Sequence, residues 1–206
     1  MLLATRNAQK LVELRRILAA SDICGVQVVG LDDVQSLPEI PETAATFEGN
    51  ALAKARDAAA GTGLATVADD SGLEVDALNG MPGVLSARWA GRHGDDAANL
   101  QLVLDQLADV PEDRRGAAFV CAAALVVPPG VDLPETQTVV RGDWRGTLTR
   151  APRGSNGFGY DPIFVPDGDR RTSAELEPAE KDAVSHRGRA LRALLPALRE
   201  VLSPRS

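Results

Sequence analysis

The chain has 206 residues, 44% hydrophobic and 25% charged, which is enough apolar material for one α/β domain or two closely joined lobes. Its formal net charge of −7 argues against a nucleic-acid backbone or an anionic membrane surface as partner. Cys24 and Cys121 form neither a disulfide framework nor a zinc spacing, which is typical of a reducing cytoplasm. Because the sequence shows neither a signal-peptide pattern nor a long apolar run, we expect a cytoplasmic protein.

The first residues predict a short strand, a polar turn and a helix. Apolar residues 1–4 are followed by a helical repeat of Leu11, Leu14, Ile17 and Leu18. Asn7 is the expected N-cap of this helix. The free N–H groups of a helix N-terminus, together with Arg6 and Lys10, suit a phosphate group. The glycines and the Lys-Ser/Thr pair of a Walker loop are missing.

A helix over residues 47–60 is predicted next, with Thr46 as its N-cap and Gly61 at its end. Asn50 and Lys54 are four residues apart and therefore share one face of this helix. The turn that follows would bring Lys54 close to the acidic strand described next.

A short apolar strand ends in two adjacent carboxylates, Asp69 and Asp70, followed by Ser71 and Gly72. Because side chains alternate along a strand, the two acids would face opposite sides and have different jobs. If the strand stops there, the pair lies at the rim of the sheet, where open α/β sheets bind ligands. A polar turn that merely closes the strand is the alternative interpretation.

Residues 73–77 alternate and reach Asn79-Gly80, which predicts a hairpin. Asp95 is the expected cap of an amphipathic helix. Further strands are predicted at residues 26–29, 117–127, 138–140 and 147–148, of which 117–127 has the pattern of a central strand covered on both faces.

Two C-terminal segments also suggest ligand contacts. Glycines among aromatic residues in 153–162 allow close approach to a flat ligand, and a plain tight turn is the alternative. Ser185 is the expected N-cap of the last helix, with His186 and Arg187 in its first turn. Cations there oppose the helix dipole, which favours an anionic or carbonyl-bearing ligand nearby. Pro196 is expected to kink or split this helix.

Together these motifs resemble the inosine triphosphate pyrophosphatase family, over nearly the whole chain. In chain order they are Thr5-Arg6-Asn7-x-x-Lys10, Thr46-Phe47-x-x-Asn50-Ala51-x-x-Lys54-Ala55, Ala68-Asp69-Asp70-Ser71-Gly72-Leu73, Gly157-Phe158-Gly159-Tyr160-Asp161-Pro162 and Ser185-His186-Arg187-Gly188. The resemblance implies an α/β fold with an elongated mixed β-sheet flanked by helices, two lobes around a central cleft, and a homodimer. We therefore interpret residues 1–206 as one nucleotide pyrophosphatase domain without a linker.

The resemblance also implies the activity: hydrolysis of ITP, dITP and XTP to the monophosphate and pyrophosphate, with Mg²⁺. Asp70 would be general base and metal ligand, Glu42 a second metal ligand with Glu39 as the alternative, and Asp69 would complete the metal site. The implied substrate-binding residues are Thr5, Arg6, Asn7, Ala8, Gln9, Lys10, Lys54 and Ser71 for the phosphates, and Phe158, Gly159, Tyr160, Asp161, Lys181, His186 and Arg187 for base and sugar.

The chemistry of the residues agrees with this assignment. Mg²⁺ takes one or two protein carboxylates and bridges substrate phosphates. It would also offset the repulsion between adjacent acids, which otherwise raises their pKa values.

Two alternatives to this function remain, and the residue spacing excludes a third. Septum-inhibitor-like pyrophosphatases have a similar fold but carry Ser-x-Ser-x-x-Arg where this chain has Thr5 to Lys10. A haloacid-type phosphatase needs an Asp-x-Asp spacing, which Asp69-Asp70 does not provide. A non-catalytic nucleotide sensor on the same scaffold would differ from the enzyme by releasing no pyrophosphate.

Overall fold

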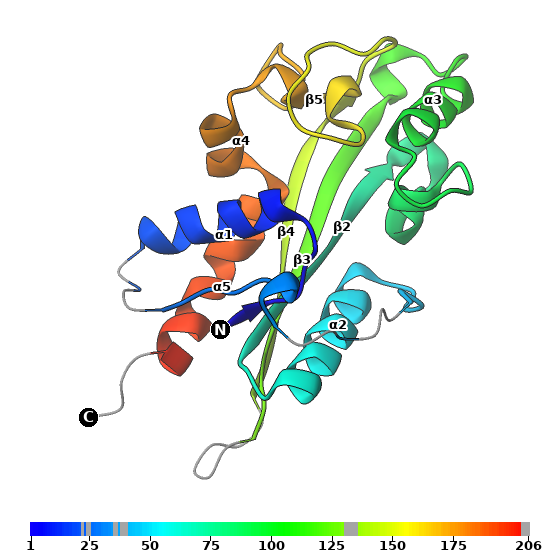
Figure 1. The fold of residues 1–206 in the computed structure, drawn as a ribbon. Coiled ribbons are helices and arrows are strands. Elements are labelled where there is room, and N and C mark those ends of the chain that lie inside the picture. The colour runs from blue at the N-terminus through cyan, green and yellow to red at the C-terminus, as the bar shows by residue number, and fades with distance from the viewer. Residues whose placement is uncertain (22, 24–25, 35–36, 38–40, 130–135, 203–206) are drawn as a thin grey trace. The chain divides into compact units, whose positions relative to one another are not determined.

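Among the residues that the computed structural model describes, 1–21, 23, 26–34, 37, 41–129 and 136–202, five strands form one mixed sheet (Figure 1). In sheet order they are β1 (Leu2–Leu3), β2 (Thr66–Val75), β3 (Gly116–Val127), β4 (Thr136–Leu148) and β5 (Phe164–Pro166). β1 is parallel to β2, whereas β4 and β5 are antiparallel. The predicted mixed α/β sheet is thus confirmed.

The chain divides into two compact units. Unit 1 contains Met1–Asp70, Cys121–Gly142 and Arg187–Ser206, and unit 2 contains Ser71–Val120 and Asp143–His186. Strands β2, β3 and β4 contribute residues to both units.

The helices are α1 (Ala8–Ala19), α2 (Phe47–Thr62), α3 (Asp96–Gln106), α4 (Pro178–Val184) and α5 (His186–Leu202). The central cleft that the family resemblance implies stays a prediction.

In unit 1, helices cover both faces of the sheet. Leu14 of α1 and Leu194 of α5 pack in one cluster with Val67 of β2 and Leu125 of β3. Figure 1 shows α1 (blue) and α5 (orange to red) on one side of the strands and α2 (cyan) on the other. Besides the polar Asn50, the side chains that α2 buries are small apart from one ring, and they are Phe47, Ala51, Ala55, Ala58 and Ala59. This arrangement gives each face of β2 its own set of helical neighbours.

Unit 2 has a separate core that is richer in aromatic residues. Leu100 and Val103 of α3 share a cluster with Trp144 of β4 and Phe164 of β5. The rings of Trp144 and Phe164 have centroids 5.3 Å apart. This core supports the segment around residues 157–161, which carries the predicted base-binding residues.

Local sequence signals for the helix starts are confirmed. The side chains of Asn7, Thr46 and Asp95 each accept a hydrogen bond from the backbone N–H three residues on, at 3.4, 3.1 and 3.2 Å. These bonds satisfy N–H groups that lack a partner within the helix. The central strand predicted at 117–127 is also confirmed, because β3 is buried along almost its whole length.

The strand with the acid pair does not stop where the sequence suggested. β2 continues through Asp69 and Asp70 to Val75, so the prediction that the carboxylates lie at the rim of the sheet is wrong. Gly72 permits the continuation, since a Cβ there would lie 2.6 Å from the carbonyl oxygen of Gly83. The acids therefore lie in mid-strand, where packing on both faces selects their partners.

Other strand predictions changed in extent. Residues 26–29 form no strand, and Val29 makes only an isolated parallel bridge to Leu2. The strands predicted at 138–140 and 147–148 are parts of the single strand β4. The turn at Asn79-Gly80 is present, but the chain returns with one bridge, Glu74 to Pro82, instead of a second strand. Proline lacks the N–H that a longer ladder would need.

The predicted end of one helix and the predicted split of another were wrong, whereas a kink at Pro196 stays a prediction. α2 passes Gly61 and ends at Gly63, whose φ of 68° forms a left-handed C-cap. Gly61 serves packing instead, because a Cβ there would come within 2.6 Å of Leu37 Cδ2. α5 is not split, since it continues through Pro196 while Leu194 and Leu198 stay buried on either side. Burial of an apolar face offsets the ~3 kcal/mol that an interior proline costs.

Helix α4 was not predicted, and Ser185 lies between it and α5. Cys24, Glu39 and residues 130–135 lie outside the described residues. No helix in the described part of the chain has both the length and the apolar character to cross a membrane.

Candidate functional site

Asp69 and Asp70 are the centre of two different clusters in unit 1. Asp69 contacts cations from α1 and α5, whereas Asp70 contacts side chains of α2. Because α1 and α5 lie on one side of the strands and α2 on the other, the partners agree with the alternation of a continuous strand (Figure 1). The prediction that the two acids do different jobs therefore has a structural basis.

Asp69 is a buried anion held by two cations. Its Oδ2 accepts from Lys10 Nζ at 2.8 Å and from Arg187 Nε at 3.3 Å. Arg187 Nη1 also donates to Glu13 Oε2 at 3.5 Å. Burial opposes ionisation of Asp69, but the charges of Lys10, Arg187 and Lys54 outweigh it and hold its pKa well below the ordinary value. The charge of Asp69 is thus compensated by cationic side chains of the protein itself.

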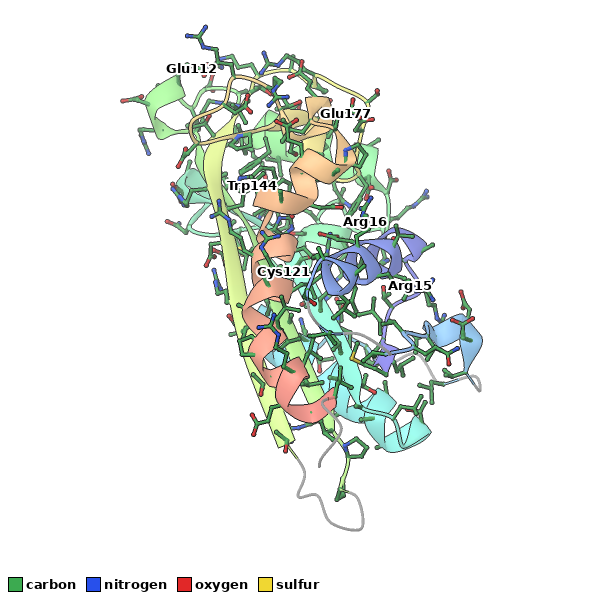
Figure 2. All side chains as sticks on the ribbon, turned by 90° about the vertical axis from the view of Figure 1, so that its left-hand side faces the viewer. Arg15, Arg16, Glu112, Cys121, Trp144 and Glu177 are labelled. Carbon is green, nitrogen blue, oxygen red and sulfur yellow. The ribbon has the colours of Figure 1, made fainter. Side chains whose placement is uncertain are left out.

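Cys121 of β3, labelled in Figure 2, lies beneath this cluster with its Sγ 4.0 Å from Asp69 Oδ2. Burial, reinforced by the charge of Asp69, raises the pKa of Cys121 to about 12. The thiol is therefore protonated at neutral pH and serves as a small core side chain.

Asp70 has the environment of a proton acceptor. Asn50 Nδ2 donates to Asp70 Oδ2 at 2.9 Å, and Lys54 Nζ lies 3.7 Å from Asp70 Oδ1. Burial raises the pKa of Asp70 above its ordinary value and the charge of Glu42 adds to this, although Lys54 and the Asn50 hydrogen bond oppose it. A carboxylate with a raised pKa is a better general base near neutral pH.

Glu42 joins this second cluster through Lys54. Lys54 Nζ donates to Glu42 Oε1 at 2.7 Å, so one ammonium contacts both Glu42 and Asp70. Two carboxylates that share a cation form the hard oxygen donor set that suits Mg²⁺. The described residues contain no group of three or more His, Cys, Asp or Glu placed to hold a metal. The set fits an ion that keeps several waters and completes its shell with substrate oxygens.

The predicted phosphate-binding turn forms the start of α1. Thr5 Oγ1 accepts from the Asn7 N–H at 3.1 Å, and Asn7 caps the helix. Ala8, Gln9 and Lys10 form its first turn, whereas Arg6 precedes it and is exposed. The side chain of Gln9 lies outside the described residues. Helix N–H groups beside a lysine are suited to phosphate oxygens.

In unit 2, Asp161 organises the predicted base-binding segment. Its Oδ2 accepts from the Phe158 N–H at 2.8 Å and also from Lys181 Nζ, while its Oδ1 accepts from Ser173 Oγ at 2.6 Å. Gly157 has a φ of 78°, and a Cβ there would lie 2.0 Å from the Asp161 carboxylate, so only glycine fits. The carboxylate of Asp161 thus fixes the loop.

Phe158 presents its ring to solvent, because 43% of this residue is exposed. Lys181 Nζ lies 5.7 Å from its ring centroid. An exposed ring held by a fixed backbone is suited to stack on a flat base. Gly159 is tied down through its N–H, which donates to Asp96 Oδ2 at 2.9 Å.

Tyr160 and His186 are buried in unit 2. Tyr160 donates its hydroxyl to the Ser86 carbonyl at 2.8 Å. The His186 ring stacks on Phe119 at 4.9 Å and lies parallel to Trp144, labelled in Figure 2, at 6.4 Å. Ser71 follows Asp70 on β2 and is partly buried.

Three residues with clear roles were missed by sequence reasoning. Glu13 shares Arg187 with Asp69, Ser173 binds Asp161, and Asn50 orients Asp70. Asn50 also accepts from the Ala44 N–H at 2.9 Å, which ties the Glu42 loop to α2. The sequence signal for Asn50 was a polar residue on the alanine-rich face of the predicted helix. Glu13 and Ser173 offered no such signal.

Comparison with known proteins decides the family. The sequence model of the Ham1 family matches residues 1–197. This chain belongs to the Ham1 family. The resemblance inferred from the motifs is therefore confirmed over nearly the whole chain.

Relatives of this Ham1 protein carry informative names. A protein from Nocardia farcinica named dITP/XTP pyrophosphatase is 70% identical over 197 residues, covering 96% of this chain and 93% of that protein. A Mycobacterium tuberculosis protein of the same name is 65% identical over 201 residues, covering 98% and 96%.

Solved structures agree with the fold. A crystal structure from Mycobacterium abscessus, named nucleoside-triphosphatase/dITP/XTP pyrophosphatase, is 64% identical with a TM-score of 0.76, covering 95% of this chain and 98% of that one. A HAM1 protein from Coxiella burnetii is 43% identical with a TM-score of 0.85, covering 97% and 98%. The Ham1 fold is thus shared beyond close relatives.

Proposed function

We propose that this Ham1 protein is a nucleoside triphosphate pyrophosphatase that hydrolyses ITP, dITP and XTP to the monophosphate and pyrophosphate, removing these non-standard purine nucleotides from the pool. The observation that carries the proposal is the pairing of buried Asp70 with Lys54 and Glu42 in a chain 65–70% identical to proteins named dITP/XTP pyrophosphatase. The cluster supplies a base, a cation for phosphate and a pair of hard oxygen donors.

Asp70 is the proposed general base. Its pKa is raised by burial, and Asn50 holds one carboxylate oxygen in a fixed direction. It would take a proton from the water that attacks the α-phosphorus, while Lys10 and Lys54 stabilise charge on the phosphates. The free N–H groups at the start of α1 would bind further phosphate oxygens.

Mg²⁺ is the proposed cofactor, with Glu42 and Asp70 as its protein ligands. When bound, it would supply positive charge to the triphosphate and its leaving group. The family resemblance also implies Asp69 as a metal ligand, but Asp69 already contacts Lys10 and Arg187. We therefore propose that Asp69 positions these two cations, and its direct contact with metal stays an untested prediction.

For the base, we propose that Phe158 stacks on the purine and that Lys181 and Asp161 hold this segment in place. The ring of Phe158 is exposed, and Asp161 anchors both its backbone and Lys181. A homodimer and a cytoplasmic location follow the family resemblance, and light scattering after size exclusion tests the first of these.

The decisive experiment is pyrophosphate release from ITP, dITP and XTP with Mg²⁺, compared with ATP. We expect rapid release from the first three and little from ATP. Nucleotide binding without release from any of them would favour the sensor, whereas a preference for modified pyrimidine nucleotides would favour the septum-inhibitor-like alternative.

A further inference from the structure

Lys54 holds a position that a metal ion would need. Its ammonium lies 2.7 Å from Glu42 Oε1 and 3.7 Å from Asp70 Oδ1, the two proposed magnesium ligands. The distance between the two carboxylate oxygens therefore cannot exceed the sum of these two distances. The Lys54 ammonium is close to both oxygens. A resident cation thus already binds this oxygen pair.

The ammonium is held there by charge. A lysine side chain is cationic at neutral pH, and the Lys54 ammonium faces the carboxylates of both Glu42 and Asp70. Only 22% of its side chain is exposed, so the ion pair is partly shielded from solvent.

The surroundings of the pair hold the acids in place without the ammonium. Asn50 binds Asp70 Oδ2, and the same side chain anchors the loop of Glu42 through the Ala44 N–H. Lys54, in contrast, has a long flexible stem that leaves α2 and can redirect its charged end. Asn50 thus fixes the Asp70 carboxylate and the backbone next to Glu42, whereas the ammonium between the two acids is on a flexible side chain that can move.

We propose that the Lys54 ammonium is an internal competitor of the divalent ion, occupying the Glu42–Asp70 oxygen pair until a nucleotide phosphate draws it away. Two cations cannot share the pair without repulsion, so metal binding requires Lys54 to leave. A triphosphate offers Lys54 other oxygens, which couples metal binding to nucleotide binding. This inference rests on the proposed function, because it assumes the same metal ligands and substrate.

The first test measures metal binding without nucleotide. Mn²⁺ is titrated into the protein, and the free ion is followed by electron paramagnetic resonance. We expect Lys54→Met to bind Mn²⁺ at least ~10-fold more tightly than wild type, or about 1.4 kcal/mol. Glu42→Gln combined with Lys54→Met should lose this gain, which places the ion at the carboxylate pair.

Arg56→Gln is the matched control. Arg56 lies on the same helix and bonds Gln137, so its loss removes one positive charge without touching Glu42 or Asp70. We expect Mn²⁺ affinity close to wild type. An equal gain in Arg56→Gln, or no gain in Lys54→Met, would overturn the proposal.

A second test observes Lys54 directly. The chain contains only three lysines, Lys10, Lys54 and Lys181, so lysine labelled with ¹³C at Cε gives three side-chain signals. Mg²⁺ without nucleotide should shift the Lys54 signal and leave that of Lys181 unchanged. A Lys54 signal that stays fixed while Mg²⁺ binds would contradict displacement.

The same signal tests the role of phosphate. ITP added in excess EDTA should shift the Lys54 signal in the absence of metal. A signal that stays in place would show that the nucleotide does not draw Lys54 away from Glu42 and Asp70. These measurements need no turnover. A failure of the proposed hydrolysis would instead appear as absent pyrophosphate release from a protein that still shows the Mn²⁺ behaviour.

Discussion

Asn50 connects the proposed base to the loop of the proposed metal ligand: its amide donates to Asp70 Oδ2 and accepts from the Ala44 N–H, both at 2.9 Å. The side chain is buried, so neither bond is replaced by water at low cost. One residue therefore sets both the direction of the Asp70 carboxylate and the course of the segment that carries Glu42.

We predict that Asn50→Ala lowers kcat by ~10-fold or more, because general-base catalysis depends on the position of the base. It should also lower the free energy of unfolding by about 1–3 kcal/mol. Asn99→Ala is the matched control. Asn99 is equally buried and also joins a helix to a loop, accepting from the Ala90 N–H and donating to the Ala87 carbonyl. It should lose comparable stability while kcat of the folded fraction stays near wild type.

The two adjacent acids should separate activity from stability. We predict that Asp70→Asn lowers kcat by at least ~10² to 10⁴ and leaves the protein folded. Burial and Glu42 disfavour the ionised form of Asp70, so a neutral isostere removes no net stabilisation. Steady-state kinetics and thermal unfolding measure the two effects. Retention of most of the wild-type kcat would show that Asp70 is not the base.

Asp69→Asn should instead reduce stability. Lys10 and Arg187 would lose a buried anionic partner, and breaking such a pair costs about 3–5 kcal/mol. Because these cations also serve the proposed site, activity should fall as well. Urea unfolding at pH 7 tests the prediction, and an unfolding free energy equal to that of wild type would contradict it.

The acid sensitivity of folding should depend on Asp69. Its pKa is depressed in the folded protein, so its stabilising contribution is present above its ordinary pKa of ~3.9 and is lost as pH falls below that value. Wild type should therefore lose more free energy of unfolding than Asp69→Asn between about pH 5 and pH 2. This interval brackets the ordinary pKa of an aspartate, at roughly 3.9. Urea unfolding at several pH values gives both slopes. Identical slopes would mean that Asp69 titrates normally in the folded state.

The bond that breaks is a further prediction. If Asp70 activates water against the α-phosphorus, hydrolysis in ¹⁸O-labelled water places the label in the monophosphate and leaves pyrophosphate unlabelled. Phosphorus NMR and mass spectrometry of the products detect this. Nucleoside diphosphate and orthophosphate as primary products would place the attack at the γ-phosphorus instead.

Base selectivity should reside in polar contacts and not in stacking. We predict that kcat/KM for ITP or dITP exceeds that for ATP by ~10² or more, since each buried donor left unpaired by adenine costs about 1–3 kcal/mol and two such mismatches reach this ratio at about 1.4 kcal/mol per tenfold. Phe158→Ala should raise KM for both purines by ~10-fold or more, because stacking tolerates any base. The ratio between them should then stay unchanged.

We predict that His186→Ala shrinks that ratio, because the family resemblance implies that His186 contacts the base or sugar. We predict the same direction for Arg187→Ala, but the loss of its bonds to Asp69 and Glu13 should lower stability too. Comparable rates on ATP and ITP in the wild type would refute the selectivity while leaving a general nucleotide pyrophosphatase possible.

The sequence by itself determined the features that depend on near neighbours. The caps at Thr46 and Asp95 act over three residues, and the buried run of β3 is apolar in any context. The motifs also identified the family. Such signals are readable because their physical cause lies within one turn or one strand.

Only the tertiary structure decided which cation serves which acid. Lys10 reaches Asp69 across 59 residues and Arg187 reaches it across 118, because α1 and α5 pack on one face of β2 while α2 packs on the other. The strand had to continue past Asp70 for this to happen, although Gly72 suggested its end. Burial on both faces outweighed that local preference, because β-strand stability depends on side-chain packing more than on intrinsic propensity. Alternation along the strand already predicted that Asp69 and Asp70 differ, but the partners that each acid meets arise from packing between distant segments, which no short stretch of sequence specifies.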